Sequence, residues 1–303
     1  MAEFSKTPKT HEEQLAILEG RGLRVADRES ALHRLAHINY YRLSAYRLPL
    51  TAPGEPDRFR PGAAFEDLCR LYDFDQSLRR IVLDASERVE VSVRASWAYA
   101  LAHRHGAFAY EDPGLFRSAE EHAALLRRLD EELERSREEF VAHFRSKHGL
   151  RRPPVWAASE VLSFGLASRF LSELKHSADR QEVARGYGLD ERILVSFLHH
   201  LTVVRNHAAH HARLWNRRFA ITFQIPRRPE RLRASLNPDP VGTRRVYNTL
   251  AMLVELAGSI DPEYELRPAL LELLRRLAPE EHGLMGFPPD WESRPIWNPR
   301  GPR

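Results

Sequence analysis

The chain has 303 residues, of which 43% are apolar and 29% are charged, so it is long enough to bury a core and has an ordinary globular composition. No apolar run reaches the roughly 18 residues that a membrane-spanning helix needs, and the polar first residues lack the apolar stretch of a signal peptide. The single cysteine, Cys69, excludes an internal disulfide and a multi-cysteine zinc site. These features predict a soluble, cytoplasmic protein without membrane association.

Arginine dominates the basic residues. The 46 basic and 42 acidic residues leave a net charge of +4, and only four of the basic residues are lysines. Guanidinium groups match phosphate oxygens, which favours contact with nucleic acid. A coding bias toward arginine explains the same composition, so composition leaves both interpretations open.

Helix signals begin near the N-terminus. Thr10 and Glu13 have the spacing of a capping box, and Asp27 is placed to cap a second short helix. The aromatic stretch INYYRLSAYRLPL occupies residues 38–50, and the prolines that follow predict a loop. From about residue 64, apolar residues recur at helical spacing and predict one long helix, with an inward stripe of Phe65, Leu68, Leu71, Leu78, Val82, Ala85, Val89 and Val93.

Helices are also expected throughout the rest of the chain. Ser118 begins a charged helix through about residue 144, shorter helices follow, and Asp190 begins a long helix that should reach about Asn216. Residues 219–225 alternate, so any small hairpin is expected there. Further helices are expected at 241–260 and 267–277, before a tail too rich in proline for regular structure. The sequence therefore predicts an all-α protein.

Histidines gather on the long helix that begins at Asp190. Imidazole titrates near neutral pH, so such a cluster suits acid–base chemistry. Arg205 and His210 form an Arg-x4-His pattern with the polar Asn206 between them. The pattern occurs three times, and only this copy follows a strongly apolar helical run. The histidines are His199, His200, His207, His210 and His211.

On a continuous helix, Asn206, His210, Arg213 and Arg217 would fall along one face. Arg205 would lie about 140° from His210, so the two do not stack on one straight helix. A two-fold axis near this helix would bring two copies of the pair together. We therefore expect a homodimer with a shared site, unless the Arg205 side chain reaches around the helix.

Other chemistries have weaker support. His207 and His211 have a spacing that suits zinc, but no HExxH motif, nearby cysteine or carboxylate on the same turn accompanies them. The chain has no Gly-x-Ser-x-Gly, Gly-x-Gly-x-x-Gly or P-loop motif. We expect neither a metal nor a cofactor. A purely structural histidine cluster remains an alternative.

The segment RNHAAHHARLWNR (205–217) resembles the signature of the Abi-like proteins, the D/F type of bacterial abortive-infection systems. The segments at 38–50, 71–94 (LYDFDQSLRRIVLDASERVEVSVR), 155–170 (VWAASEVLSFGLASRF) and 286–297 (GFPPDWESRPIW) are similar to other parts of that family, in the expected order. The resemblance covers nearly the whole chain, which makes it far more specific than Arg-x4-His alone.

This resemblance implies a HEPN-type helical bundle with additional N-terminal and C-terminal helices. The implied organisation is an N-terminal helical segment (1–62), a HEPN-like domain (63–278) and a proline-rich tail (279–303). Arg205 and His210 would be catalytic, with Asn206 as the polar neighbour. His211 satisfies a looser form of the motif, so the choice between His210 and His211 stays open. Glu87 and Glu90 on the first long helix are candidate partners for Arg205.

The implied function is that of a phage-defence toxin, a metal-independent endoribonuclease acting as a homodimer. The alternative is a non-catalytic RNA-binding or sensing protein that associates with a small noncoding RNA. Arginines would contact phosphates and tyrosines would stack on bases, although core packing explains the tyrosines as well. The expected RNA-binding residues are Arg213, Arg217, Arg218, Arg227, Arg228, Tyr40, Tyr41 and Tyr46.

Overall fold

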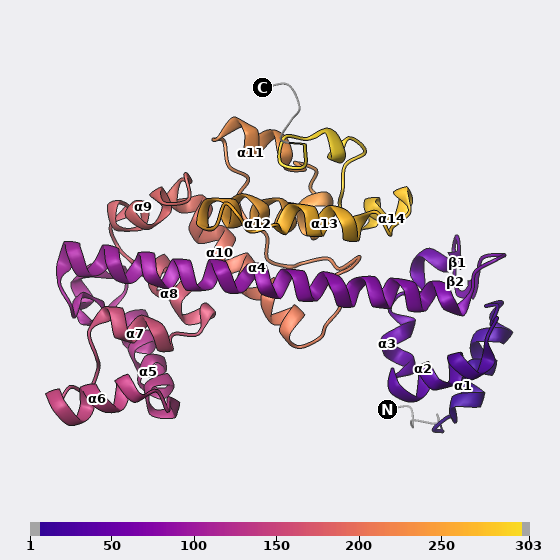
Figure 1. Ribbon diagram of the computed structural model, residues 1–303, viewed down its shortest axis with the longest axis horizontal. Helices are drawn as coiled ribbons and strands as arrows, with labels where there is room; N and C mark the ends of the chain where they lie inside the picture. Colours follow the sequence, from indigo (N-terminus) through magenta and orange to yellow (C-terminus); the bar gives the residue numbers. More distant parts are fainter. Residues whose placement is uncertain (1–6, 299–303) are drawn as a thin grey trace. The chain divides into compact units, whose positions relative to one another are not determined.

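The computed structural model describes residues 7–298, and α-helices dominate this part of the chain (Figure 1). The predicted all-α fold class is confirmed. The helices are α1 (His11–Gly20), α2 (Arg28–His37), α3 (Tyr40–Ser44), α4 (Phe65–His105), α5 (Ala119–Arg135), α6 (Glu139–His148), α7 (Val155–Val161), α8 (Phe164–Glu173), α9 (Ser177–Arg185), α10 (Glu191–Ala209), α11 (Glu230–Ser235), α12 (Tyr247–Ile260), α13 (Leu266–Leu274) and α14 (Pro279–Leu284).

The chain forms two compact units, residues 1–78 and 79–303, and the division falls inside α4. The sequence placed a boundary after residue 62, at the end of the proline-containing loop. Helix α4, which follows this loop, is 41 residues long and contains no proline or glycine. No local signal in the sequence therefore marks the division between Leu78 and Arg79.

The unit of residues 1–78 is built from short, capped helices. The Thr10 side chain accepts a hydrogen bond from the backbone N–H of Glu13, whose carboxylate returns one from Thr10 N–H, so the predicted capping box is present. The Asp27 side chain caps α2. Apolar side chains from these helices and from the start of α4 form its core, among them Leu15, Leu18, Leu35, Leu43 and Phe65.

A two-stranded hairpin lies where the sequence predicted a proline-rich loop. Strands β1 (Thr51–Ala52) and β2 (Glu55–Phe59) pair antiparallel, and Gly54 between them adopts a φ of 79°, which glycine tolerates best. The hairpin expected at 219–225 was wrong, because that segment is irregular. Its Phe219 N–H donates to Arg244 O, at the end of a short 3₁₀ helix and not in a partner strand.

In the unit of residues 79–303, α4 provides the central apolar stripe. Val82, Ala85, Val89 and Val93 are all fully buried, as their helical spacing predicted. Helix α10 packs on α8 and α9, and α5 packs on α7 and α8. Figure 1 shows α12 and α13 running beside α4, and the Arg88 guanidinium on α4 contacts Asp261 after α12 at 3.0 Å.

Two expectations for this unit were wrong in detail. The charged helix predicted through residue 144 is broken into α5 and α6, because the Ser136 hydroxyl binds the Glu138 N–H in place of a helical partner. The tail is more regular than predicted. Pro279 occupies the first turn of α14, where proline is tolerated, and Trp297 is buried with its indole N–H donating to the Tyr247 hydroxyl at 3.2 Å.

Candidate functional site

Helix α10 positions most of the candidate residues. The Asp190 side chain accepts a hydrogen bond from the Arg192 N–H at 2.9 Å and caps its N-terminus. The apolar residues that recur at helical spacing along α10 are buried: Ile193, Leu194, Phe197, Leu198, Leu201 and Val204. This packing fixes the rotation of the helix and therefore the directions in which its arginine and histidines point.

The helix ends at Ala209, not near Asn216 as predicted. His210 is the C-cap, and His211 adopts the left-handed conformation at φ 58°. The Ala212 N–H donates to His207 O at 2.8 Å and closes the turn. Leu214 and Trp215 are fully buried, and the turn directs the chain back to bury them. The predicted common face with Arg213 and Arg217 therefore does not form.

Arg205 is anchored to α4 through Glu90. Its guanidinium lies 3.5 Å from a Glu90 carboxylate oxygen, and the other oxygen of Glu90 is bound by Arg94. The Arg205 guanidinium also donates to the Asn206 side-chain oxygen at 3.3 Å. Burial raises the pKa of Glu90, although both arginines oppose this effect. Of the two predicted partners, Glu90 makes the contact.

A recess of about 540 Å³ opens beside this ion pair. Its walls contain three carboxylates and two guanidiniums, so it is better suited to hold Arg205 than to attract a phosphate by itself. The Arg205 side chain remains 38% exposed, which leaves part of its guanidinium accessible. The lining residues are Leu83, Asp84, Glu87, Glu90, Val91, Arg94 and Arg205.

His210 and Asn206 are exposed at the end of α10, as is His211. They come from the last turn of the helix and the residues just after it. The backbone N–H of His210 donates to Asn206 O at 3.0 Å, which ties the cap to the helix. The imidazoles of both histidines are therefore accessible from solvent, on a backbone that a hydrogen-bonded turn holds in place.

Two other histidines of α10 have structural roles. The fully buried His200 donates from Nδ1 to Ile221 O and accepts from the Thr249 hydroxyl at Nε2, both at 2.8 Å. Burial lowers the pKa of His200 to about 4, so it is neutral at physiological pH. His207 donates from Nδ1 to Val203 O of its own helix at 2.7 Å.

Arginines cluster after the turn. Arg245, between the short 3₁₀ helix η4 (Gly242–Arg244) and α12, donates to both the backbone and side-chain oxygens of Asn216. Burial lowers the pKa of Arg245, and the nearby charges of Arg218 and Arg213 lower it further. The Arg217 side chain donates to Arg213 O. Sequence reasoning missed Arg245, because it lies 28 residues beyond Arg217 and no motif marks it.

The remaining predicted RNA-binding residues differ in accessibility. Arg227 and Arg228 are exposed in the loop before α11. In the other unit Tyr41 is 75% exposed, and Tyr40 is half-buried. Tyr46 is only 1% exposed and donates its hydroxyl to Asp75 at 2.6 Å. Its ring is therefore part of the core and is not a surface on which a base can stack, which corrects its place in the predicted set.

Within residues 7–298, no group of three or more histidine, cysteine, aspartate or glutamate side chains could hold a metal ion. His207 and His211 therefore have no third such ligand beside them in that part of the chain. No helix in the same range is both long and apolar enough to cross a bilayer.

Comparison with known proteins identifies the family. The model of the Abi-like protein family matches residues 33–216, which is more than half of the chain, and the chain belongs to this family. The match runs from the second half of α2 through the turn after α10, and thus includes both the Glu90 and the Arg205 sides of the recess. No curated protein and no solved structure gave a significant match. Family membership points to abortive infection, a form of phage defence.

Proposed function

We propose that this chain is a phage-defence toxin, a HEPN-type endoribonuclease that cleaves RNA without a metal ion through Arg205 and His210. The observation that carries the proposal is the arrangement at the end of α10. A guanidinium fixed by Glu90 and Asn206 lies less than two helical turns before an exposed histidine cap. A positioned cation and an accessible imidazole are the groups that cleavage of a phosphodiester requires.

The reaction would begin with attack of the ribose 2′-oxygen on the adjacent phosphorus. The bond from phosphorus to the 5′-oxygen breaks, which gives a 2′,3′-cyclic phosphate and a free 5′-hydroxyl. One imidazole accepts the proton of the 2′-hydroxyl, and a protonated imidazole donates a proton to the leaving 5′-oxygen. Arg205 would stabilise the negative charge that develops on the phosphoryl oxygens.

A second chain would supply the second imidazole. The stripe of Val91, Ala95 and Tyr99 on α4 supports this homodimer, because all three are exposed at helical spacing. Val91 also lines the recess that holds Arg205. Burying the stripe against a second copy would remove apolar surface from water and bring two Arg205–Glu90 pairs close to the same two-fold axis.

The arginine cluster favours a second candidate function. Arg213, Arg218 and Arg245 lie close enough for their charges to interact, and clustered guanidiniums bind phosphates whether or not cleavage follows. In this alternative the chain binds RNA, such as a small noncoding RNA, without turnover. Cleavage in the presence of EDTA distinguishes the two functions, because binding alone leaves the RNA intact.

The test uses purified protein, a labelled single-stranded RNA pool and excess EDTA. We expect cleavage products with cyclic phosphate ends from the wild type, and a loss of about 10²–10⁴ in rate for His210→Ala. Arg205→Ala should be similarly impaired. His211→Asn is the matched control, because asparagine tolerates the left-handed backbone that residue 211 adopts.

The proposal fails if wild-type protein leaves RNA intact in EDTA while binding it, or if His210→Ala cleaves at the wild-type rate. If His211→Asn is inactive and His210→Ala is active, His211 is the catalytic histidine. If light scattering shows a monomer under conditions in which RNA is cleaved, the shared site of the homodimer is refuted, and cleavage by a single chain is retained.

A further inference from the structure

A second cleft lies apart from Arg205, in the same unit. It has a volume of about 760 Å³, within the usual range for small-ligand sites. Helices α5, α8, α9 and α10 and the segment before α5 form its walls. Arg117 comes from that segment. Its backbone N–H donates to Glu173 O, and the Lys175 N–H donates to Leu115 O in the same segment, so the segment is held beside the end of α8. The cleft shares no lining residue with the Arg205 recess.

The back wall is a buried ion pair. Arg180 is only 6% exposed. Its guanidinium donates to Glu191 at 2.6 Å and to the carbonyl oxygens of Leu174 and Lys175. Several other polar groups of the wall are also bound within the protein. The Ser172 hydroxyl donates to Arg169 O, and the Ser196 hydroxyl donates to Ile193 O. These bonds within the protein shape the cleft.

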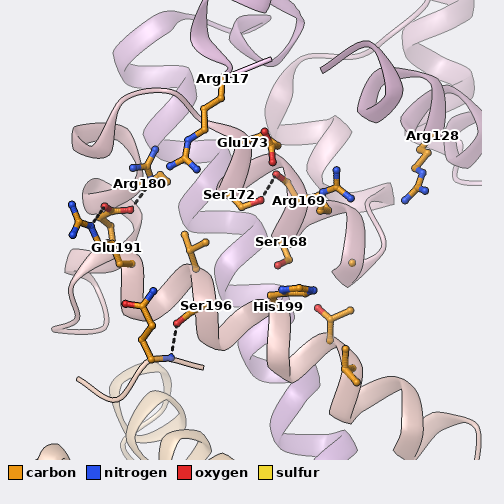
Figure 2. Close-up of a pocket in the computed structure, with 16 residues that line it drawn as sticks. Arg117, Arg128, Ser168, Arg169, Ser172, Glu173, Arg180, Glu191, Ser196 and His199 are labelled. Atoms are coloured by element: carbon orange, nitrogen blue, oxygen red, sulfur yellow. Dashed lines mark hydrogen bonds and ion pairs between the residues drawn. The ribbon is translucent and has the colours of Figure 1, made fainter. Parts of the chain in front are cut away.

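The lining groups with no such partner among residues 7–298 include the guanidiniums of Arg117 and Arg128, the imidazole of His199 and the hydroxyl of Ser168. Ser168 is only 6% exposed and lines the cleft, where its hydroxyl can bind a polar group of a ligand. Figure 2 shows Ser168 directly above the His199 ring, with Arg117 and Arg128 on opposite sides of them.

The charge of the cleft favours an anion. Five arginines and two glutamates line it, which leaves three net positive charges. Arg180 neutralises Glu191 and Arg169 is paired with Glu121, so Arg117 and Arg128 face a cleft in which Glu173 is the remaining lining carboxylate. The two guanidiniums lie on opposite sides of the centre in Figure 2, so a ligand that contacts both needs negative charge spread over several groups.

We propose that this cleft binds a nucleoside polyphosphate. Arg117 and Arg128 would hold its phosphates, since guanidinium–phosphate bonds are charge-assisted. The exposed His199 ring and the apolar wall of Val195 and Val203 would pack against the base. The Ser168 hydroxyl would bind a polar atom of the ligand. The nucleotide site is separate from Arg205 and His210, so a nucleotide bound there would regulate the protein without occupying the proposed catalytic site.

The test is isothermal titration of the RNA-free full chain with ATP, GTP, inorganic tripolyphosphate and the two nucleosides. We expect saturable 1:1 binding of at least one nucleotide, weaker binding of tripolyphosphate and none of the nucleosides. Arg117→Gln and Arg128→Gln should each weaken nucleotide binding about tenfold or more. Arg127→Gln is the matched control, because Arg127 is the exposed neighbour of Arg128 on α5 and does not line the cleft.

Circular dichroism and thermal unfolding establish that each variant is folded before its binding is interpreted. The proposal is overturned if no nucleotide binds, if tripolyphosphate binds as tightly as the nucleotides, or if Arg127→Gln weakens binding as much as Arg128→Gln. A titration with a short single-stranded RNA completes the test. If RNA binds, nucleotides do not, and Arg117→Gln weakens the RNA complex, the cleft belongs to an RNA surface instead.

Discussion

His200 should make the stability of the larger unit fall as the pH drops below the ordinary pKa of histidine. It is fully buried, and its pKa is lowered to about 4 from the ordinary 6.5. Because the unfolded chain binds a proton more readily than the folded one, stability is fully present above pH 6.5 and is lost as the pH falls toward 4. For these two values the loss between pH 8 and pH 5 is about 2 kcal/mol.

The perturbation that isolates this contribution is His200→Gln. Glutamine can still donate toward Ile221 O and accept from the Thr249 hydroxyl, but it does not titrate. At pH 8 we expect the variant to be less stable by about 1 kcal/mol, because its hydrogen bonds fit less well. Between pH 8 and pH 5 the wild type should lose about 2 kcal/mol that the variant does not, so the difference should vanish or reverse.

Urea unfolding followed by tryptophan fluorescence is a suitable assay, because all five tryptophans lie in the unit of residues 79–303. His176→Gln serves as the control, since His176 is exposed in the same unit, and its pH dependence should follow the wild type. If the stabilities of wild type and His200→Gln fall in parallel from pH 8 to pH 5, His200 is not the buried neutral group described above and the reasoning is wrong.

Three further predictions concern other parts of the chain. Tyr46→Phe should lower the free energy of unfolding by about 1–3 kcal/mol, through loss of the bond to buried Asp75, without weakening RNA binding in a filter assay. Glu90→Gln should slow RNA cleavage about tenfold with little change in thermal stability, because it releases Arg205 while removing a carboxylate that burial disfavours; an unchanged rate would contradict the anchoring role. Arg218→Gln should reduce the slope of log affinity for RNA against log salt by about one, and equal slopes would remove Arg218 from the RNA contacts.

Local signals in the sequence were enough to predict most helices. The Thr10–Glu13 box, the Asp27 cap and the apolar stripe of α4 act over a few residues, so they are readable without tertiary information. The start of α10 at Asp190 was predicted for the same reason. Glu90 was predicted as a partner for Arg205 from the family resemblance, and the structure places the two side chains 3.5 Å apart.

What the sequence did not reveal depends on contacts between distant segments. Nothing near His211 signals a helix end, since the turn follows from the burial of Leu214 and Trp215 in the core. Arg245 approaches Asn216 only after the chain has passed through α11 and η4. Tyr46 and Tyr41 occupy the same short aromatic segment, and only packing determines that one is buried and the other exposed.

The left-handed backbone of His211 has a consequence for genetics. Alanine is the customary replacement in a mutational scan, but at this position it adds a backbone penalty of about 1 kcal/mol that glycine and asparagine largely avoid. A toxicity defect in an alanine variant would thus combine the loss of an imidazole with a shift of the neighbouring cap. Substitutions that keep the turn, such as His211→Gly, separate these two effects, and a natural homologue with glycine at this position would keep the geometry around His210 intact.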